Sequence, residues 1–124
     1  MIRFENGVAI NATSAPEYTG NLELISPEDL LVAAISSCHM MTFLAIASLK
    51  NWLVQTYNDQ AQGFLEENSR GRVMMNRVIL QPQVLFSGSN LPTSKEQEDI
   101  HFKAKRSGFI TNSVRTSISI QPHF

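Results

Sequence analysis

The sequence predicts a single α+β domain in which antiparallel strands accompany one long buried helix and one shorter amphipathic helix. Its 124 residues suit one domain and are too few for two ordinary ones. Hydrophobic residues make up 43% of the chain, which is enough for a core. A charge-free run follows strong helix-start signals, and the later stretches are rich in strand-forming residues bounded by turns. No repeat or linker divides residues 1–124.

The N-terminal residues predict a hairpin. Ile2–Glu5 and Val8–Thr13 alternate apolar and polar side chains on either side of Asn6-Gly7, which is a strong hairpin signal. The next residues, Ser14–Ile25, contain a proline and a glycine and are expected to form an irregular connection.

The long helix is expected from Ser26 to about Lys50. Ser26 can cap the free amide groups, Pro27 suits the first turn, and the two following carboxylates complement the helix dipole. Leu30–Leu49 contains no Asp, Glu, Lys or Arg and is long enough to cross a bilayer. Serine, threonine and histidine interrupt this stretch, and neither an aromatic belt nor clustered positive charge flanks it. We therefore expect a buried helix of a soluble protein rather than a membrane span.

Strands are expected beyond Trp52. The stretches rich in strand-forming residues are Val54–Asp59, Ala61–Glu67, Val73–Phe86 and Thr116–Gln121. Gly63 is expected to mark a bulge. Pro82 predicts that its strand lies at an edge or bends there, because proline cannot donate a ladder hydrogen bond.

A second helix is expected over Lys95–Ser107, capped by Thr93 or Ser94. Ile100 and Ala104 define its narrow apolar face, and its mixed charges are expected to pair along the helix. His101 is expected to be an ordinary surface histidine on this helix. The four methionines at 40, 41, 74 and 75 are expected to fill the core.

Composition excludes several classes of function. A net charge of −1 lacks the basic excess that nucleic-acid binding needs. The one cysteine excludes an internal disulfide and multi-cysteine zinc sites, and it favours a reducing, cytoplasmic location. The N-terminus has no apolar targeting segment. We therefore expect no metal, no cofactor, no nucleic-acid partner and no membrane partner.

Cys38 and Glu28 are the two candidate site residues. Cys38 is either a buried structural thiol or a reactive one, and a mid-helix thiol needs a nearby cation or base for activation. Its neighbour His39 projects about 100° away around the helix and is not an automatic partner. Glu28 is either a helix-start carboxylate or a catalytic one. About 15 Å of straight helix separates the two residues, so a shared site needs a bent helix or a second chain.

The run from Ser26 to Met41, SPEDLLVAAISSCHMM, resembles the signature of the OsmC/Ohr family, in which a cysteine follows a Pro-Glu pair and a leucine-rich helix. Later features agree with it. They are Tyr57 with Ala61 and Gly63, the stretch Val78–Pro82, and the stretch Phe109–Val114. The resemblance covers about residues 14 to 122 in the family's order.

This resemblance implies an intertwined homodimer in which sheets wrap around long central helices. It also implies reduction of organic hydroperoxides, with Cys38 as the peroxidatic residue and Glu28 as the carboxylate that orients an activating arginine. A second cysteine resolves the sulfenic acid as a disulfide in the family's enzymes. A dimer can supply Glu28 and Cys38 to one site from different chains.

The sequence departs from the family pattern at two places. The resolving cysteine corresponds to Gly108, and the matching stretch for the activating arginine, Glu17–Asn21, contains none. Arg3 lies upstream in the wrong register, and the other candidates to replace the arginine are Arg77, Arg106 and Arg115. A thiol without a neighbouring cation is a slow nucleophile at neutral pH.

Two hypotheses about function remain. The first is a one-cysteine peroxidase in which Cys38 attacks an organic hydroperoxide and an external thiol reduces the product. The alternative is a catalytically silent homodimer of the same fold that binds a small hydrophobic ligand.

Overall fold

The computed structural model describes residues 1–14 and 20–124. Residues 15–19, within the predicted irregular connection, lie outside the described residues. The chain forms two compact units, Met1–Leu31 and Val32–Phe124, and each is described by itself.

The first unit contains the predicted hairpin, which is confirmed but short. Strands β1 (Ile2–Arg3) and β2 (Ala9–Ile10) pair antiparallel, with Ile2 opposite Ile10. Gly7 has a φ of 89° and donates to the Phe4 carbonyl oxygen. A turn ending in a left-handed residue suits a three-residue hairpin loop better than a two-residue one. Later in this unit Ala12 forms an isolated bridge with Ile25.

Helix α1 spans Pro27–Leu49 and begins with the predicted cap. The Asp29 amide donates to Ser26 Oγ over 3.1 Å, and the Ser26 amide donates to Asp29 Oδ2 over 3.3 Å. This reciprocal pair satisfies two amides that the helix itself leaves free. At the other end Asn51 has a φ of 59°, which turns the chain out of the helix.

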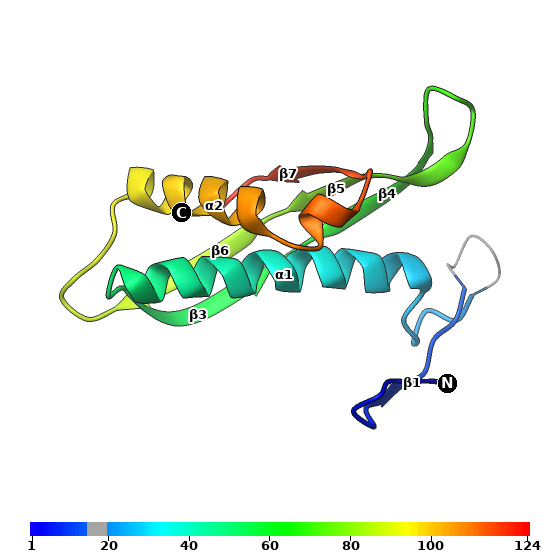
Figure 1. Ribbon diagram of the computed structural model, residues 1–124, viewed down its shortest axis with the longest axis horizontal. Coiled ribbons are helices and arrows are strands. Elements are labelled where there is room, and N and C mark those ends of the chain that lie inside the picture. Colours follow the sequence, from blue (N-terminus) through cyan, green and yellow to red (C-terminus); the bar gives the residue numbers. More distant parts are fainter. Residues whose placement is uncertain (15–19) are drawn as a thin grey trace. The chain divides into compact units, whose positions relative to one another are not determined.

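The second unit contains two sheets behind the helices (Figure 1). Strand β3 (Leu53–Asp59) pairs antiparallel with β6 (Pro82–Ser87). Strand β4 (Gln62–Glu67) pairs antiparallel with β5 (Val73–Leu80). Strand β7 (Ser117–Ile120) joins the other edge of β5 in a parallel pair, so the expectation of antiparallel strands is wrong for this pair.

Pro82 interrupts the long strand as predicted, whereas Gly63 has a different role from the predicted one. The predicted strand Val73–Phe86 is two strands, because the chain bends at Gln81 and Pro82 begins β6 in another sheet. The bulge expected at Gly63 is wrong: the register shifts between Phe64 and Leu65, and the residue without a Cα partner there is Asn76 on β5. Gly63 instead allows close packing: a Cβ there would lie 2.5 Å from Met75 Cε and 2.6 Å from Val32 Cγ2.

Helix α2 spans Ser94–Ser107 and confirms the second predicted helix. Thr93 Oγ1 accepts from the Glu96 amide, and the Glu96 carboxylate accepts from the Thr93 amide, which completes a capping box. Ile100 and Ala104 are buried as predicted. His101 is also buried, at 3% exposed, so the expectation of a surface histidine is wrong. A short 3-10 helix, η2 (Thr111–Ser113), follows.

Helix α1 buries one stripe rather than its whole surface. Ile35, His39, Phe43 and Ala47 recur every four residues and are all buried. Met41 is 62% exposed, so the expectation that it fills the core of this chain is wrong. By length and composition α1 could cross a membrane, but core helices of soluble proteins pass the same test, which makes this weak support for insertion.

Candidate active site around Cys38

Cys38 lies in the middle of α1, one position before a residue of the buried stripe. It is a free thiol of intermediate burial. Its backbone carbonyl oxygen accepts a hydrogen bond of 3.0 Å from Thr42 Oγ1 one turn later. The thiol therefore lies at the border between the core stripe and the exposed face of α1, partly open to a small reactant.

Gly108 lies directly against the Cys38 thiol. It is the C-cap of α2, is buried, and has a φ of −71°, which any residue can adopt. A Cβ at Gly108 would lie 3.4 Å from Cys38 Sγ and 3.0 Å from Thr111 Oγ1. The end of α2 thus covers one side of the thiol with backbone alone.

The two buried histidines form a direct pair between the helices. His39 Nε2 lies 2.9 Å from His101 Nδ1, and the rings are nearly parallel, with an interplanar angle of 6°. The hydrogen-bond partner of His39 is thus His101 on α2. This agrees with the expectation that His39 is not an automatic partner of Cys38.

Burial explains the chemistry of this pair. It lowers the pKa of His39 from 6.5 to about 4, with Asp59 opposing the shift and Lys105 adding to it. Burial likewise lowers the pKa of His101 to about 4, and the neighbouring His39 lowers it further. Both rings are therefore neutral at pH 7 and share one N–H···N hydrogen bond.

Asp59, at the end of β3, connects α1 to the bend before β6. One of its carboxylate oxygens accepts from Ser36 Oγ over 2.5 Å, and the other accepts from the Gln81 amide over 2.6 Å. On the same strand, burial raises the pKa of Tyr57, and Asp59 raises it further. The Tyr57 hydroxyl is buried without a hydrogen-bond partner among the described residues.

Glu28 lies in the first turn of α1, within the first unit. Its Oε2 atom is buried and has no hydrogen-bond partner among residues 1–14 and 20–124. Buried carboxylates ordinarily have a cation or several donors beside them. Glu28 and Cys38 are both in α1 and ten residues apart in sequence, so the helix itself does not bring them into contact.

The arginines named as replacements differ in what they contact. Arg77 forms an ion pair of 2.9 Å with Glu66 and covers the Phe64 ring, which leaves it engaged elsewhere. Arg106 lies over the ring of Phe102. Neither Arg106 nor Arg115 has an ion pair within the described part of the chain.

The same region lacks the ligands of a metal centre. No group of three or more His, Cys, Asp or Glu side chains that could hold a metal ion occurs among the described residues. The histidine pair offers only two imidazoles, which already bind each other.

The sequence pattern missed the histidine pair and the Asp59 bridge. His39 could have been assigned to the core from its spacing, since it lies four residues after Ile35 and four before Phe43. His101 had a weaker signal, because it borders the Ile100–Ala104 face. Asp59 gave no signal, because its partners lie 22 and 23 residues away in sequence.

Comparison with known proteins identifies the family. The model of the OsmC-like protein family matches residues 20–123. A solved OsmC-like protein of unknown function from Vibrio cholerae is 38% identical with a TM-score of 0.95, covering 98% of this chain and 81% of its own.

Two more distant structures share the fold. An organic hydroperoxide resistance protein OsmC from Legionella pneumophila is 16% identical with a TM-score of 0.73, covering 97% and 84% of the two chains. An organic hydroperoxide resistance protein from Elizabethkingia anophelis is 19% identical with a TM-score of 0.76, covering 97% and 83%. No curated protein matches. The family match and the 38% identity together show that this chain belongs to the OsmC-like protein family.

Proposed function

We propose that this protein is a one-cysteine, thiol-dependent peroxidase that reduces small organic hydroperoxides as a cytoplasmic homodimer. Cys38 is the attacking thiol, Glu28 orients a cation in the site, and an external thiol completes the cycle. The relatives named for organic hydroperoxide resistance support the substrate class. No metal or cofactor enters the proposed reaction.

One contact carries the proposal: the thiol of Cys38 adjoins the Gly108 position. Family resemblance assigns the attacking cysteine to position 38 and the resolving cysteine to position 108. A Cβ at Gly108 would lie 3.4 Å from Cys38 Sγ, so the two positions have the proximity that a disulfide requires. This proximity supports the assignment of a redox site to these two positions, although one of the two thiols is missing.

The reaction begins when the Cys38 thiolate attacks the terminal oxygen of the hydroperoxide and forms an S–O bond with it. The O–O bond breaks, the departing alkoxide takes a proton to become an alcohol, and Cys38 becomes a sulfenic acid. An external thiol then attacks the sulfenic sulfur, which releases water and leaves a mixed disulfide. A second external thiol reduces that disulfide and restores Cys38. Two thiols thus supply the two electrons that the hydroperoxide takes up.

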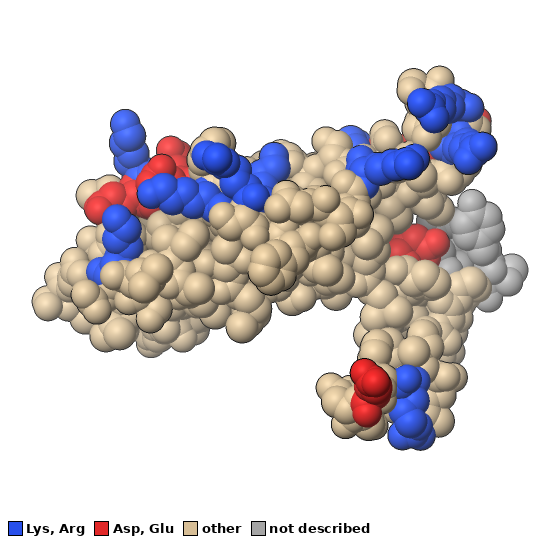
Figure 2. Space-filling view, in the orientation of Figure 1, with Lys and Arg blue, Asp and Glu red and all other residues tan. Residues whose placement is uncertain are grey.

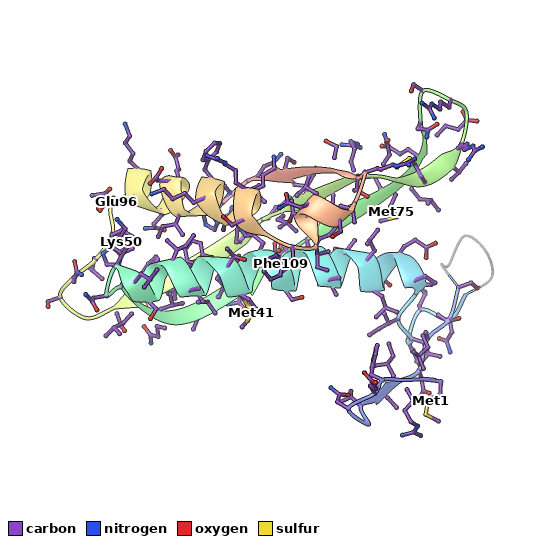
Figure 3. All side chains as sticks on the ribbon, in the orientation of Figure 1. Met1, Met41, Lys50, Met75, Glu96 and Phe109 are labelled. Atoms are coloured by element: carbon purple, nitrogen blue, oxygen red, sulfur yellow. The ribbon has the colours of Figure 1, made fainter. Side chains whose placement is uncertain are left out.

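A second copy of this chain is the proposed partner. Figure 2 shows the α1 face almost free of charge, whereas the Lys and Arg side chains gather near α2 and the β4–β5 turn. Exposed apolar side chains include Met41 and Phe109, the latter 85% exposed (Figure 3). The unpartnered Glu28 oxygen requires a donor that one chain does not supply among its described residues. Packing of two copies along α1 would cover the apolar side chains and allow the partner to provide that donor.

Peroxide consumption tests the enzyme proposal. We expect wild-type protein to consume an organic hydroperoxide in the presence of a small thiol, and to accumulate a dimedone-reactive sulfenic acid without it. Cys38→Ser should abolish both signals, whereas Ser37→Ala, on the exposed neighbouring position, should retain both. Equal rates for wild type and Cys38→Ser would refute the enzyme proposal.

Sedimentation tests the dimer separately. We expect a mass of twice 13.9 kDa at micromolar concentration. A mass of one chain would refute the homodimer and leave the thiol chemistry to be judged by the peroxide assay.

The silent ligand-binding dimer remains the second candidate because Gly108 contributes no thiol beside Cys38. It predicts a dimer without Cys38-dependent peroxide consumption. The two assays together therefore separate the candidates.

A further inference from the structure

The His39–His101 pair is the buried ionisable feature that the peroxidase proposal does not use. Both rings are almost fully buried, at 1% and 3% exposed. They join α1 to α2, which are 62 positions apart in sequence at this contact. The ring of Phe43 lies against His101 with 4.4 Å between centroids, so one side of the pair is apolar.

The geometry of the pair permits only limited protonation. A neutral imidazole has one donor and one acceptor nitrogen, whereas an imidazolium has two donors. At 2.9 Å between His39 Nε2 and His101 Nδ1, two imidazolium rings would direct N–H groups at each other. A single added proton is also unfavourable, because it places a charged imidazolium in the buried pair whichever ring takes it. If His39 takes the proton, its Nδ1 becomes a charged donor, and that atom is buried with no hydrogen-bond partner among the described residues.

The charged groups around the pair do not neutralise such a proton. Asp59 on β3 favours a proton on His39, but its oxygens already accept from Ser36 and Gln81. Lys105 on α2 opposes the proton. Glu98 and Lys105 carry opposite charges, and both line a cavity of about 300 Å³ that also borders His101. His101 is the member of the pair that borders this cavity.

We propose that the His39–His101 pair is an acid-sensitive latch that holds α2 on α1, and that its protonation releases α2 and uncovers Cys38. The link to Cys38 is the end of α2. Ser107 is the last residue of that helix, and Gly108 packs against the Cys38 thiol. Release of α2 therefore also removes the backbone that covers the thiol.

The direction and range of the pH effect follow from the burial of both rings. Because burial lowers both pKa values to about 4, the unfolded chain binds protons more strongly than the folded one below pH 6.5. The stabilisation that the two neutral rings give to the folded state is fully present above pH 6.5 and is lost as the pH falls toward 4. Relative to pH 7.5, the opening equilibrium should rise at pH 5.5 by about 10-fold for each histidine, and by up to about 100-fold for both.

The decisive experiment measures opening with and without titratable rings. We expect hydrogen exchange in α2, corrected for the intrinsic rate, to increase at pH 5.5 far more than exchange in β4–β5. Reaction of Cys38 with a dithiodipyridine reagent, relative to a short peptide thiol at the same pH, should increase in parallel. The double variant His39→Leu/His101→Leu should lose both increases. His123→Gln, which removes the one other histidine and is at an exposed position, should keep them.

An equal pH response in the double variant and in wild type would overturn the latch. If the double variant does not fold, NMR of the histidine C2 protons in wild type tests the latch instead, because it reports whether the two buried rings are protonated. We expect the rings of His39 and His101 to remain neutral in folded protein at pH 5.5. A folded protein in which both of these rings titrate near 6.5 would overturn the proposal as well.

Discussion

Gly108→Cys should convert this protein into one that forms its own disulfide. The backbone at Gly108 has a φ of −71°, so a cysteine can occupy it without strain. The distance of 3.4 Å from a Cβ at this position to Cys38 Sγ is close to the roughly 3 Å that a disulfide requires. Thr111 Oγ1, 3.0 Å from that Cβ, must move by a few tenths of an ångström.

The size of the effect follows from the loop that the disulfide closes. Residues 38 and 108 are 70 positions apart, and closing a loop of that length stabilises the folded state by up to about 4 kcal/mol. We expect the oxidised variant to unfold at a higher urea concentration than the same variant reduced. Without an external thiol, the variant treated with an organic hydroperoxide should lose both free thiols and fail to label with dimedone.

Gly108→Ser is the matched control, since it adds a side chain of similar size that cannot form a disulfide. It should retain one free thiol before oxidation and label with dimedone afterwards. Dimedone labelling of Gly108→Cys equal to that of Gly108→Ser, with no disulfide in its peptide map, would refute the placement of Gly108 beside Cys38.

Two further predictions concern stability and are checked by urea denaturation. Gly63→Ala should destabilise the protein by about 1–3 kcal/mol, because its Cβ overlaps Met75 and the short side chain of Val32. A further Val32→Ala change should recover part of this loss. An unchanged denaturation midpoint for Gly63→Ala would contradict the close approach. Thr93→Ala should lower the free energy of unfolding by about 1 kcal/mol, because it removes the capping box of α2. Ser94→Ala should lower it by less. Equal losses in the two variants would contradict the assignment of Thr93 as the cap.

Local chemistry explains why the helices were predictable. Ser26 and Thr93 each precede a carboxylate by three residues, and both form the reciprocal cap that this spacing predicts. Pro82 also acts as a local signal, because a residue without an amide hydrogen cannot continue the ladder. These features depend on neighbours within one helical turn or one strand, which a sequence pattern contains.

Features that depend on distant residues were not predictable in the same way. The burial of His101 requires His39 on another helix, and a periodic pattern on α2 contains nothing about that partner. The parallel pairing of β7 with β5 is likewise invisible in the alternation of Ile118 and Ile120, which either direction would satisfy. The intervening α2 was the available clue, since parallel neighbours need a long crossover.

The candidate site combines both cases. Gly108 and Cys38 were paired in advance only through family resemblance, and the structure adds the distance between them. The role of Glu28 stays a prediction, since its buried oxygen has no partner among the described residues of one chain.

The neighbouring residues Cys38 and His39 show how one helix can serve two separate purposes. Successive residues project about 100° apart, so His39 falls on the buried stripe while Cys38 remains at its border. The two residues contact the same helix through different partners. His39 pairs with His101 within α2, whereas Cys38 lies against Gly108, the C-cap of α2. A change at the histidine pair should therefore reach the thiol through the position of α2 rather than through direct contact. At pH 7.5, where the latch is closed in wild type, His39→Leu/His101→Leu should react with hydroperoxide at the wild-type rate, and the two proteins should diverge only as the pH falls below 6.5.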